Sequence, residues 1–109
     1  MPTTYKVLGQ VAPSATTNTT LDTVPSATQV VISTIVVCNR AATAATFRIA
    51  VRPAGATLAN EHYIVYDSTI AANDIVALTM GITLAATDVV TVYASTANLS
   101  FSAFGSEIS

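Results

Sequence analysis

The stretch Val30-Val-Ile-Ser-Thr-Ile-Val-Val37 decides the fold class of this chain. Most of its residues are Val or Ile, whose stiff β-branched side chains favour extended backbone over helix. The nearly continuous apolar run predicts a central strand over 28–38, bent at Ser33-Thr34 and covered on both faces. The run is too short to cross a bilayer as a helix, which needs about 20 residues.

On both sides of this stretch, apolar and polar residues alternate with a period of two, as at Phe47-Arg-Ile-Ala-Val51. This alternation is typical of strands with one face on a core. We expect one all-β domain over 1–109, an antiparallel β-sandwich or a jelly-roll-like barrel, with one helical turn within 54–61. Turn residues divide the chain into about eight short strands, over 4–9, 20–24, 28–38, 45–52, 62–67, 74–80, 89–94 and 98–104.

A short internal echo supports the division into strands and turns. Ile70-Ala-Ala-Asn-Asp-Ile-Val76 returns fourteen residues later as Leu84-Ala-Ala-Thr-Asp-Val-Val90. In each copy an Asp follows a small turn and precedes a β-branched pair. Because an Asp side chain can accept hydrogen bonds from nearby backbone N–H groups, we expect it to fix the turn that begins a strand.

The composition excludes several function classes. Charged residues make up only 9% of the chain, against about 25% in average domains, and the net charge is −2. A nucleic-acid binder held by phosphate contacts is therefore excluded, and we expect no membrane partner. The single cysteine excludes a disulfide scaffold within the chain and a Cys-based zinc site, and we expect no metal and no cofactor. The opening Met-Pro-Thr-Thr-Tyr-Lys6 lacks the apolar segment of a secretory signal.

Few residues could carry chemistry, and we expect no enzymatic activity. A hydrolase would need a nucleophile and an orienting acid around the single histidine, His62, but no Gly-x-Ser-x-Gly motif is present. We interpret His62 as a surface or interface residue and Cys38 as a small buried apolar residue. Asp67, Asp74 and Asp88 are interpreted as turn-forming acids, although the sequence leaves ion binding by them open.

The shortage of charge indicates that part of the surface is covered by other subunits, because free monomers usually depend on mixed surface charge for solubility. The uncharged segment 10–20 is either a long loop or an extended arm that pairs with a neighbouring subunit. Arg48 and Arg52 share one strand face and are either solvated edge residues or interface residues. The candidate assembly contacts are Val11, Pro13, Thr17, Asn18, Arg48 and Arg52.

The chain resembles small structural proteins of tailed bacteriophages over roughly its whole length. The resemblance is carried by four stretches, Leu21-Asp-Thr-Val-Pro-Ser-Ala-Thr28, Val31-Ile-Ser-Thr-Ile-Val-Val-Cys-Asn-Arg40, Ala44-Ala-Thr-Phe-Arg-Ile-Ala-Val51 and Phe104-Gly-Ser-Glu-Ile108. These are strand and turn patterns without a chemical signature. The resemblance implies a β-sandwich virion protein that is assembled in the host cytoplasm, self-associates and docks on other virion proteins.

Within that resemblance, a separate module of this length suits a capsid cement or decoration protein that bridges capsid subunits and stabilises the shell. The implied partners are the major capsid protein and further copies of the chain, with a homotrimer preferred. The alternative is a tail, neck or baseplate component, including a receptor- or glycan-binding module at the tail tip. If 10–20 is an arm, deletion of residues 1–20 is expected to leave a folded domain that no longer decorates shells.

Overall fold

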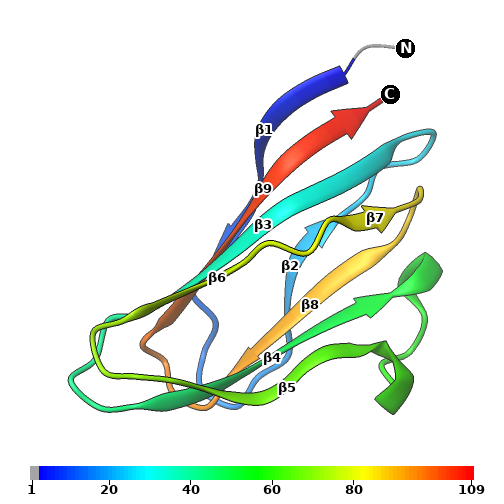
Figure 1. Cartoon of the computed structure of the whole chain (residues 1–109). Coiled ribbons are helices and arrows are strands. Elements are labelled where there is room, and N and C mark those ends of the chain that lie inside the picture. Colours follow the sequence, from blue (N-terminus) through cyan, green and yellow to red (C-terminus); the bar gives the residue numbers. More distant parts are fainter. Residues whose placement is uncertain (1–2) are drawn as a thin grey trace.

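Two antiparallel sheets face each other in the computed structural model, which describes residues 3–109 (Figure 1). The five-stranded sheet has the order β1-β9-β3-β6, with β7 also paired to β3, and the four-stranded sheet has the order β2-β8-β4-β5. The expected all-β antiparallel fold is confirmed. The elements are β1 (Thr3–Val11), β2 (Thr19–Thr23), β3 (Gln29–Asn39), β4 (Ala45–Arg52), η1 (Pro53–Gly55), η2 (Asn60–His62), β5 (Tyr63–Ile70), β6 (Ile75–Leu78), β7 (Ile82–Leu84), β8 (Val89–Ala94) and β9 (Leu99–Ile108).

Each expected strand has a counterpart, but β5 and β9 extend three and four residues beyond the expected ends at 67 and 104, and the region near Gly81 differs. The expected strand over 74–80 ends earlier, as β6 (Ile75–Leu78), and β7 (Ile82–Leu84) follows as an additional strand. Gly81 has a φ of 63°, which suits glycine and interrupts the extended backbone between the two strands. The single helical turn expected within 54–61 is replaced by two short 3-10 turns, η1 and η2.

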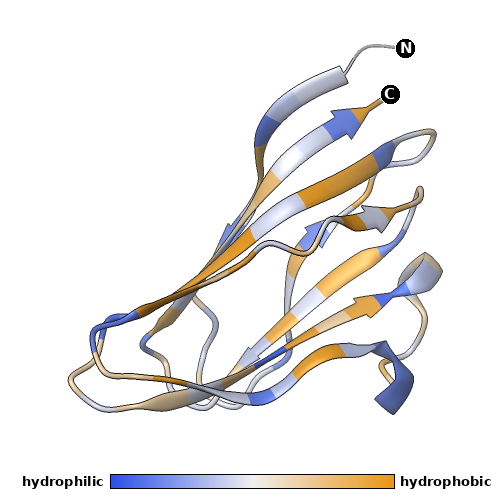
Figure 2. Ribbon diagram, in the orientation of Figure 1, coloured by the Kyte–Doolittle hydropathy of each residue, from blue (hydrophilic) through white to orange (hydrophobic). Residues whose placement is uncertain are grey.

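The core is formed by the inward-facing residues of both sheets. Phe47 of β4 and Phe101 of β9 meet across it, with ring centroids 6.1 Å apart and an edge-to-face angle of 67°. Both side chains are about 1% exposed or less, as are Ile32, Ile35 and Ile49. Figure 2 shows apolar residues along the strands and hydrophilic residues at several strand ends.

Strand β3 lies inside the five-stranded sheet and contacts β9 on one side and β6 and β7 on the other. Its pairing with β9 shifts register between Ile32 and Thr34, a β-bulge that bends the strand where the sequence predicted. The prediction that both faces are covered is wrong. Val31, Val36 and Cys38 are only half-buried on the outer face, because the second sheet covers the inner face alone.

The internal echo in the sequence corresponds to two equivalent turns. Asn73 and Thr87, the residues before the two aspartates, both have positive φ, at 52° and 70°. Each turn then forms backbone hydrogen bonds to a second loop: Asn39 N–H donates to Asp74 O at 2.9 Å, and Val24 N–H donates to Asp88 O at 3.0 Å. The two copies of the repeated sequence therefore form the same kind of turn, and each turn accepts a backbone hydrogen bond from another segment of the chain.

Asn39 fixes the loops at one end of the sandwich. The residue is 1% exposed. Its Nδ2 donates to Thr43 O at 2.9 Å and to Ala71 O at 3.1 Å, and its Oδ1 accepts from Ala41 N–H at 3.0 Å. A buried amide with these partners satisfies backbone groups that would otherwise lack them. The residue that ends the longest apolar run is thus a buried polar link between two loops.

The segment 10–20 is held on the domain and is not a free arm. Its first two residues belong to β1 and its last two to β2, and the intervening loop is tied down by Thr16 N–H donating to Ala94 O at 2.8 Å. A Cβ on Gly9 would collide with Leu21 O. Glycine is therefore required where β1 crosses β2, and β1 is an integral edge strand.

Candidate docking surfaces

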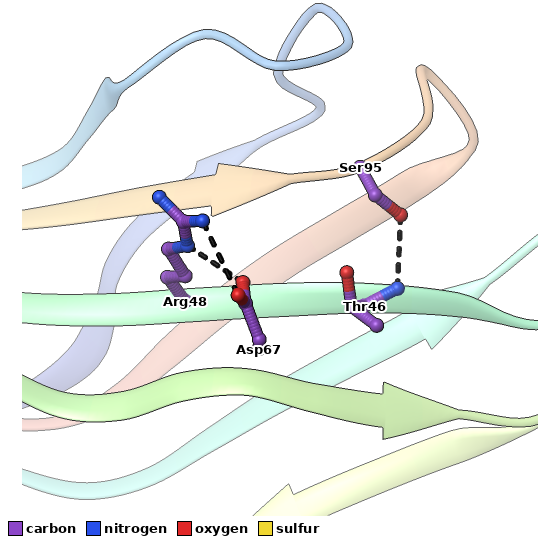
Figure 3. Close-up of polar contacts among 4 residues, drawn as sticks. All are labelled: Thr46, Arg48, Asp67 and Ser95. Atoms are coloured by element: carbon purple, nitrogen blue, oxygen red, sulfur yellow. Dashed lines mark hydrogen bonds and ion pairs between the residues drawn. The ribbon is translucent and has the colours of Figure 1, made fainter.

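The outer side of the four-stranded sheet carries an ion pair between two neighbouring strands. Arg48 of β4 donates from Nε to Asp67 Oδ1 at 2.6 Å and from Nη2 to Asp67 Oδ2 at 3.3 Å (Figure 3). Next to it, Thr46 N–H donates to Ser95 Oγ at 2.9 Å. The two-pronged pairing orients the planar guanidinium group.

Two tyrosines flank the same arginine, and a third packs against one of them. The Arg48 Cζ atom lies 4.2 Å from the Tyr66 ring centroid and 4.3 Å from the Tyr93 ring centroid. Tyr63 meets Tyr66 edge-to-face, with centroids 4.9 Å apart. These distances are within the range of cation–π and aromatic pairs. We call these five residues, Arg48, Tyr63, Tyr66, Asp67 and Tyr93, the Tyr–Arg surface.

Strand register explains why these residues meet. Arg48 lies directly opposite Tyr93 in the pairing of β4 with β8. On the other side, Phe47 pairs with Ser68 while Ile49 pairs with Val65, so one residue of β4 faces two residues of β5. This is a β-bulge, and it places both Tyr66 and Asp67 beside Arg48.

Asp67 shifts the pKa of Arg48. The hydrogen bond that Arg48 donates to the Asp67 carboxylate raises the pKa of Arg48 above its ordinary value, desolvation acts in the opposite direction, and the negative charge of Asp67 adds to the rise. The Tyr66 ring is nevertheless 58% exposed. An open cleft of about 490 Å³ lies beside it, lined by Asn60, Tyr63 and Tyr66. The Tyr–Arg surface therefore presents to the exterior an aromatic ring that packs against Arg48 and Tyr63.

Arg52 lies on the same strand but serves the local fold. Its Nε donates to Ala56 O at 2.7 Å, its Nη2 to Gly55 O at 3.1 Å, and its Nη1 to Thr91 Oγ1 at 3.1 Å. These bonds hold the loop after β4 against β8. Both arginines singled out from the sequence thus have partners within the chain.

The other four candidate contacts differ in exposure. Val11 is half-buried and packs against the core. Pro13 is buried, so its side chain is not available to a partner of the folded protein. Thr17 and Asn18 are exposed, and the Thr17 hydroxyl donates to Ala15 O at 3.1 Å. The pairing of Thr19 with Val92 and the hydrogen bond from Thr16 N–H to Ala94 O place Thr17 and Asn18 beside β8, near Tyr93.

The remaining residues considered for chemistry have structural roles. His62 Nδ1 accepts from Ala59 N–H at 3.0 Å within η2. Asp88 accepts from Ala54 N–H and Ala85 N–H, both at 2.9 Å, and Asp74 Oδ1 accepts from Ile75 N–H at 2.8 Å. These two aspartates hold turns, as interpreted from the sequence, whereas Asp67 is part of the ion pair.

Exposed apolar residues occur on both sheets. Tyr5, Val7 and Ile75 belong to the five-stranded sheet and are 85%, 48% and 61% exposed. Cys38 is half-buried on its outer face, opposite Ile75 and Ser100, and is not the buried residue expected from the sequence. Single exposed apolar residues of this kind are normal on a monomer.

No family model matches the chain, and a search of curated proteins finds no match. Within residues 3–109, no three His, Cys, Asp or Glu side chains gather as a metal site would require. The same part of the chain contains no helix with the length and apolar character needed to span a membrane.

Proposed function

We propose that this protein is a non-enzymatic structural protein of a virion, a capsid cement or decoration protein that self-associates and bridges subunits of the major capsid protein. The observation that carries the proposal is the exposed Tyr66 ring, which Arg48 and Tyr63 hold in one orientation. Tyr and Arg are enriched in protein–protein interfaces and among the residues that dominate their binding energy. The sequence resemblance to small phage structural proteins supports the virion setting.

The proposed mechanism is mechanical. A protein that binds only the assembled shell stabilises that shell by mass action. Each bridge adds contacts that must break before neighbouring capsid subunits separate. Tyr66 is already held by its neighbours, so little side-chain freedom is lost when the Tyr–Arg surface binds a partner. The homotrimer preferred from the sequence stays a prediction. The number of copies in the assembly can be measured from its mass in solution.

The proposal is tested by adding the purified protein to emptied capsids and measuring occupancy. Tyr66→Ala is expected to weaken binding roughly 30-fold or more, as for a central interface residue, while Tyr66→Phe keeps most of the affinity. Ile75→Ala is the control, because Ile75 is 61% exposed but lies on the other sheet. Unchanged occupancy by Tyr66→Ala would show that this surface is not the docking face, and wild-type protein that ignores shells would refute the cement function.

The open cleft favours a second candidate, a tail-tip module that binds glycans. Tyr66 and Tyr63 offer aromatic faces to a sugar ring, and Asn60 offers an amide to its hydroxyl groups. The two functions are separated by measuring binding to emptied capsids against binding to host surface polysaccharide. Binding to polysaccharide alone would favour the tail-tip function.

A further inference from the structure

Among the described residues, β1 is the longest of the sheet-edge strands, and its one bulge lies beyond residues 3–7. The opposite edge of the five-stranded sheet consists of β6 and β7, which are 4 and 3 residues long. In the four-stranded sheet, β5 shifts register twice against β4, and β2 has 5 residues and one shift. Short strands and bulges are the usual ways of preventing edge-to-edge pairing. The remaining edge, β1, has 9 residues.

Residues 3–7 of β1 are exposed on both faces of the sheet, and the described strands leave their outer edge unpaired. All of residues 3–7 are exposed, and Tyr5 is 85% exposed. Their described strand partner is β9, where Thr3 lies opposite Ile108 and Val7 opposite Phe104. Figure 1 shows β1 at the outer margin of the sheet. A half-strand in this position presents unpaired backbone N–H and C=O groups to an added strand.

We propose that residues 3–7 of β1 pair in antiparallel register with the same residues of a second copy. The bulge between Val7 and Gly9 ends the regular segment on one side, and a two-fold pairing of residues 3–7 is centred on Tyr5. Tyr5 then lies opposite its equivalent and Thr3 opposite Val7 of the other copy, which gives the aromatic and β-branched cross-strand pairs that stabilise sheets.

The side chains of the segment are compatible with a second copy as the occupant. Lys6 is the one charged residue in the segment, and its Nζ lies 3.5 Å from Glu107 Oε1 of its own chain. In the register centred on Tyr5, Lys6 lies opposite Thr4 of the other copy, so that no like charges are opposed. The joined edges form one continuous sheet across both subunits. The inference rests on the self-association in the proposed function and specifies its contact.

The test is the mass of the protein in solution, measured by sedimentation equilibrium up to millimolar concentration. The wild type is expected to reach twice the 11.2 kDa chain mass. Tyr5→Lys should remain at the chain mass, because it opposes two like charges at the centre of the contact. At a dilution at which both proteins are monomeric, its unfolding temperature should equal that of the wild type, since Tyr5 is 85% exposed in the single chain.

Cross-linking tests the register. In a Cys38→Ser background, Tyr5→Cys should form a disulfide-linked dimer on mild oxidation, since residues directly opposite across an antiparallel pair have Cβ atoms about 5 Å apart. Ile75→Cys in the same background is the control, because Ile75 is 61% exposed on the far edge of that sheet. Equal cross-linking of both variants overturns the register.

The outcomes separate this contact from the proposed function. A trimer that persists in Tyr5→Lys overturns the β1 pairing and leaves self-association intact. A wild type that stays monomeric at all concentrations overturns both the pairing and self-association, while capsid occupancy still decides docking. If that monomer docks on shells and Tyr5→Lys does not, β1 pairs with the shell protein and the second copy is refuted as its occupant.

Discussion

Asp67 reaches Arg48 from a backbone conformation that few residues adopt, with a φ of 52° and a distance of 2.6 Å between Asp67 Oδ1 and Arg48 Nε. The bulge in β5 creates this conformation, and the ion pair then orients the arginine between Tyr66 and Tyr93. Strained backbone of this kind persists only where neighbouring contacts hold it, and it is enriched at functional sites.

Asp67→Asn separates the charge from the backbone requirement. Asn tolerates the left-handed conformation, so the fold is expected to survive, while the loss of the carboxylate frees the Arg48 side chain. Capsid docking should weaken by about tenfold, less than in Tyr66→Ala, because the loss acts through the position of the ring. Occupancy of emptied capsids at increasing protein concentration measures the difference. Docking equal to wild type would show that the ring needs no such support.

Asp22 is expected to make the protein less stable at neutral pH than in mild acid. Burial raises its pKa above 3.8, and the negative charge of Glu107 adds to the shift. Within the part of the chain that the structure describes, Asp22 Oδ2 is buried without a hydrogen-bond partner. The folded state therefore holds the proton more tightly than the unfolded state, and stability is lost as the pH rises from 3.8 through the folded pKa.

The corresponding variant is Asp22→Asn, which cannot ionise. Its unfolding temperature should exceed that of the wild type at pH 7, and the difference should shrink as the pH falls toward 3.8. Thermal unfolding at a series of pH values measures this trend. A variant less stable than wild type at pH 7 would contradict the assignment of an unfavourable buried charge.

Asp88→Ala is expected to destabilise the protein, in contrast to Asp22→Asn. Asp88 accepts hydrogen bonds from Ala54 N–H and Ala85 N–H, both at 2.9 Å, and so ties η1 to the turn before β8. Removing both acceptors should lower the free energy of unfolding by about 1–2 kcal/mol. Urea unfolding at pH 7 provides the measurement, and a change below the experimental error would mean that water replaces the carboxylate at no cost.

Asn39→Ala should be among the more destabilising polar substitutions in this chain. It leaves Ala41 N–H and the carbonyl oxygens of Thr43 and Ala71 without their side-chain partner. Such buried groups cost about 1–3 kcal/mol when unsatisfied, and we expect a loss of about 2–3 kcal/mol in urea unfolding. Arg40→Ala, at an exposed neighbouring position, serves as the control.

Deletion of residues 1–20 is now expected to unfold the domain. It removes β1 and the first two residues of β2 (Thr19–Thr23), and it exposes the edge of β9 together with core contacts of Leu8 and Val11. Circular dichroism should show loss of the β signal. A deletion variant with a wild-type spectrum and a cooperative transition would restore the interpretation of this segment as a dispensable arm.

The fold could be predicted because its signals are local. Period-two alternation at 45–52 and the β-branched run at 30–37 are readable within a few residues, and the repeated Asp turns are visible as an echo. The Tyr–Arg surface could not be predicted in this way. Its members meet only through the registers of β4 with β5 and β8, and one added residue in a bulge decides which side chains face Arg48.

Arg52 and segment 10–20 show a second limit. The sequence shows that a guanidinium group or an uncharged segment is present. It does not show whether contacts within the chain already use that group or segment. Arg52 donates hydrogen bonds to the carbonyl oxygens of residues 55 and 56, and Val11 packs against the core. β7, with three residues, is too short to leave a periodic signal.

The pairing of Thr3 with Ile108 places the start of β1 and the end of β9 at the same end of one antiparallel ladder. Tension between these two points would break the hydrogen bonds between β1 and β9 one pair after another. An antiparallel strand pair resists force least in this direction. Tension transmitted across the sheets meets many bonds at once. Single-molecule pulling along the two directions should therefore give clearly different rupture forces, and under the proposed function a capsid would load the protein through its sheet faces.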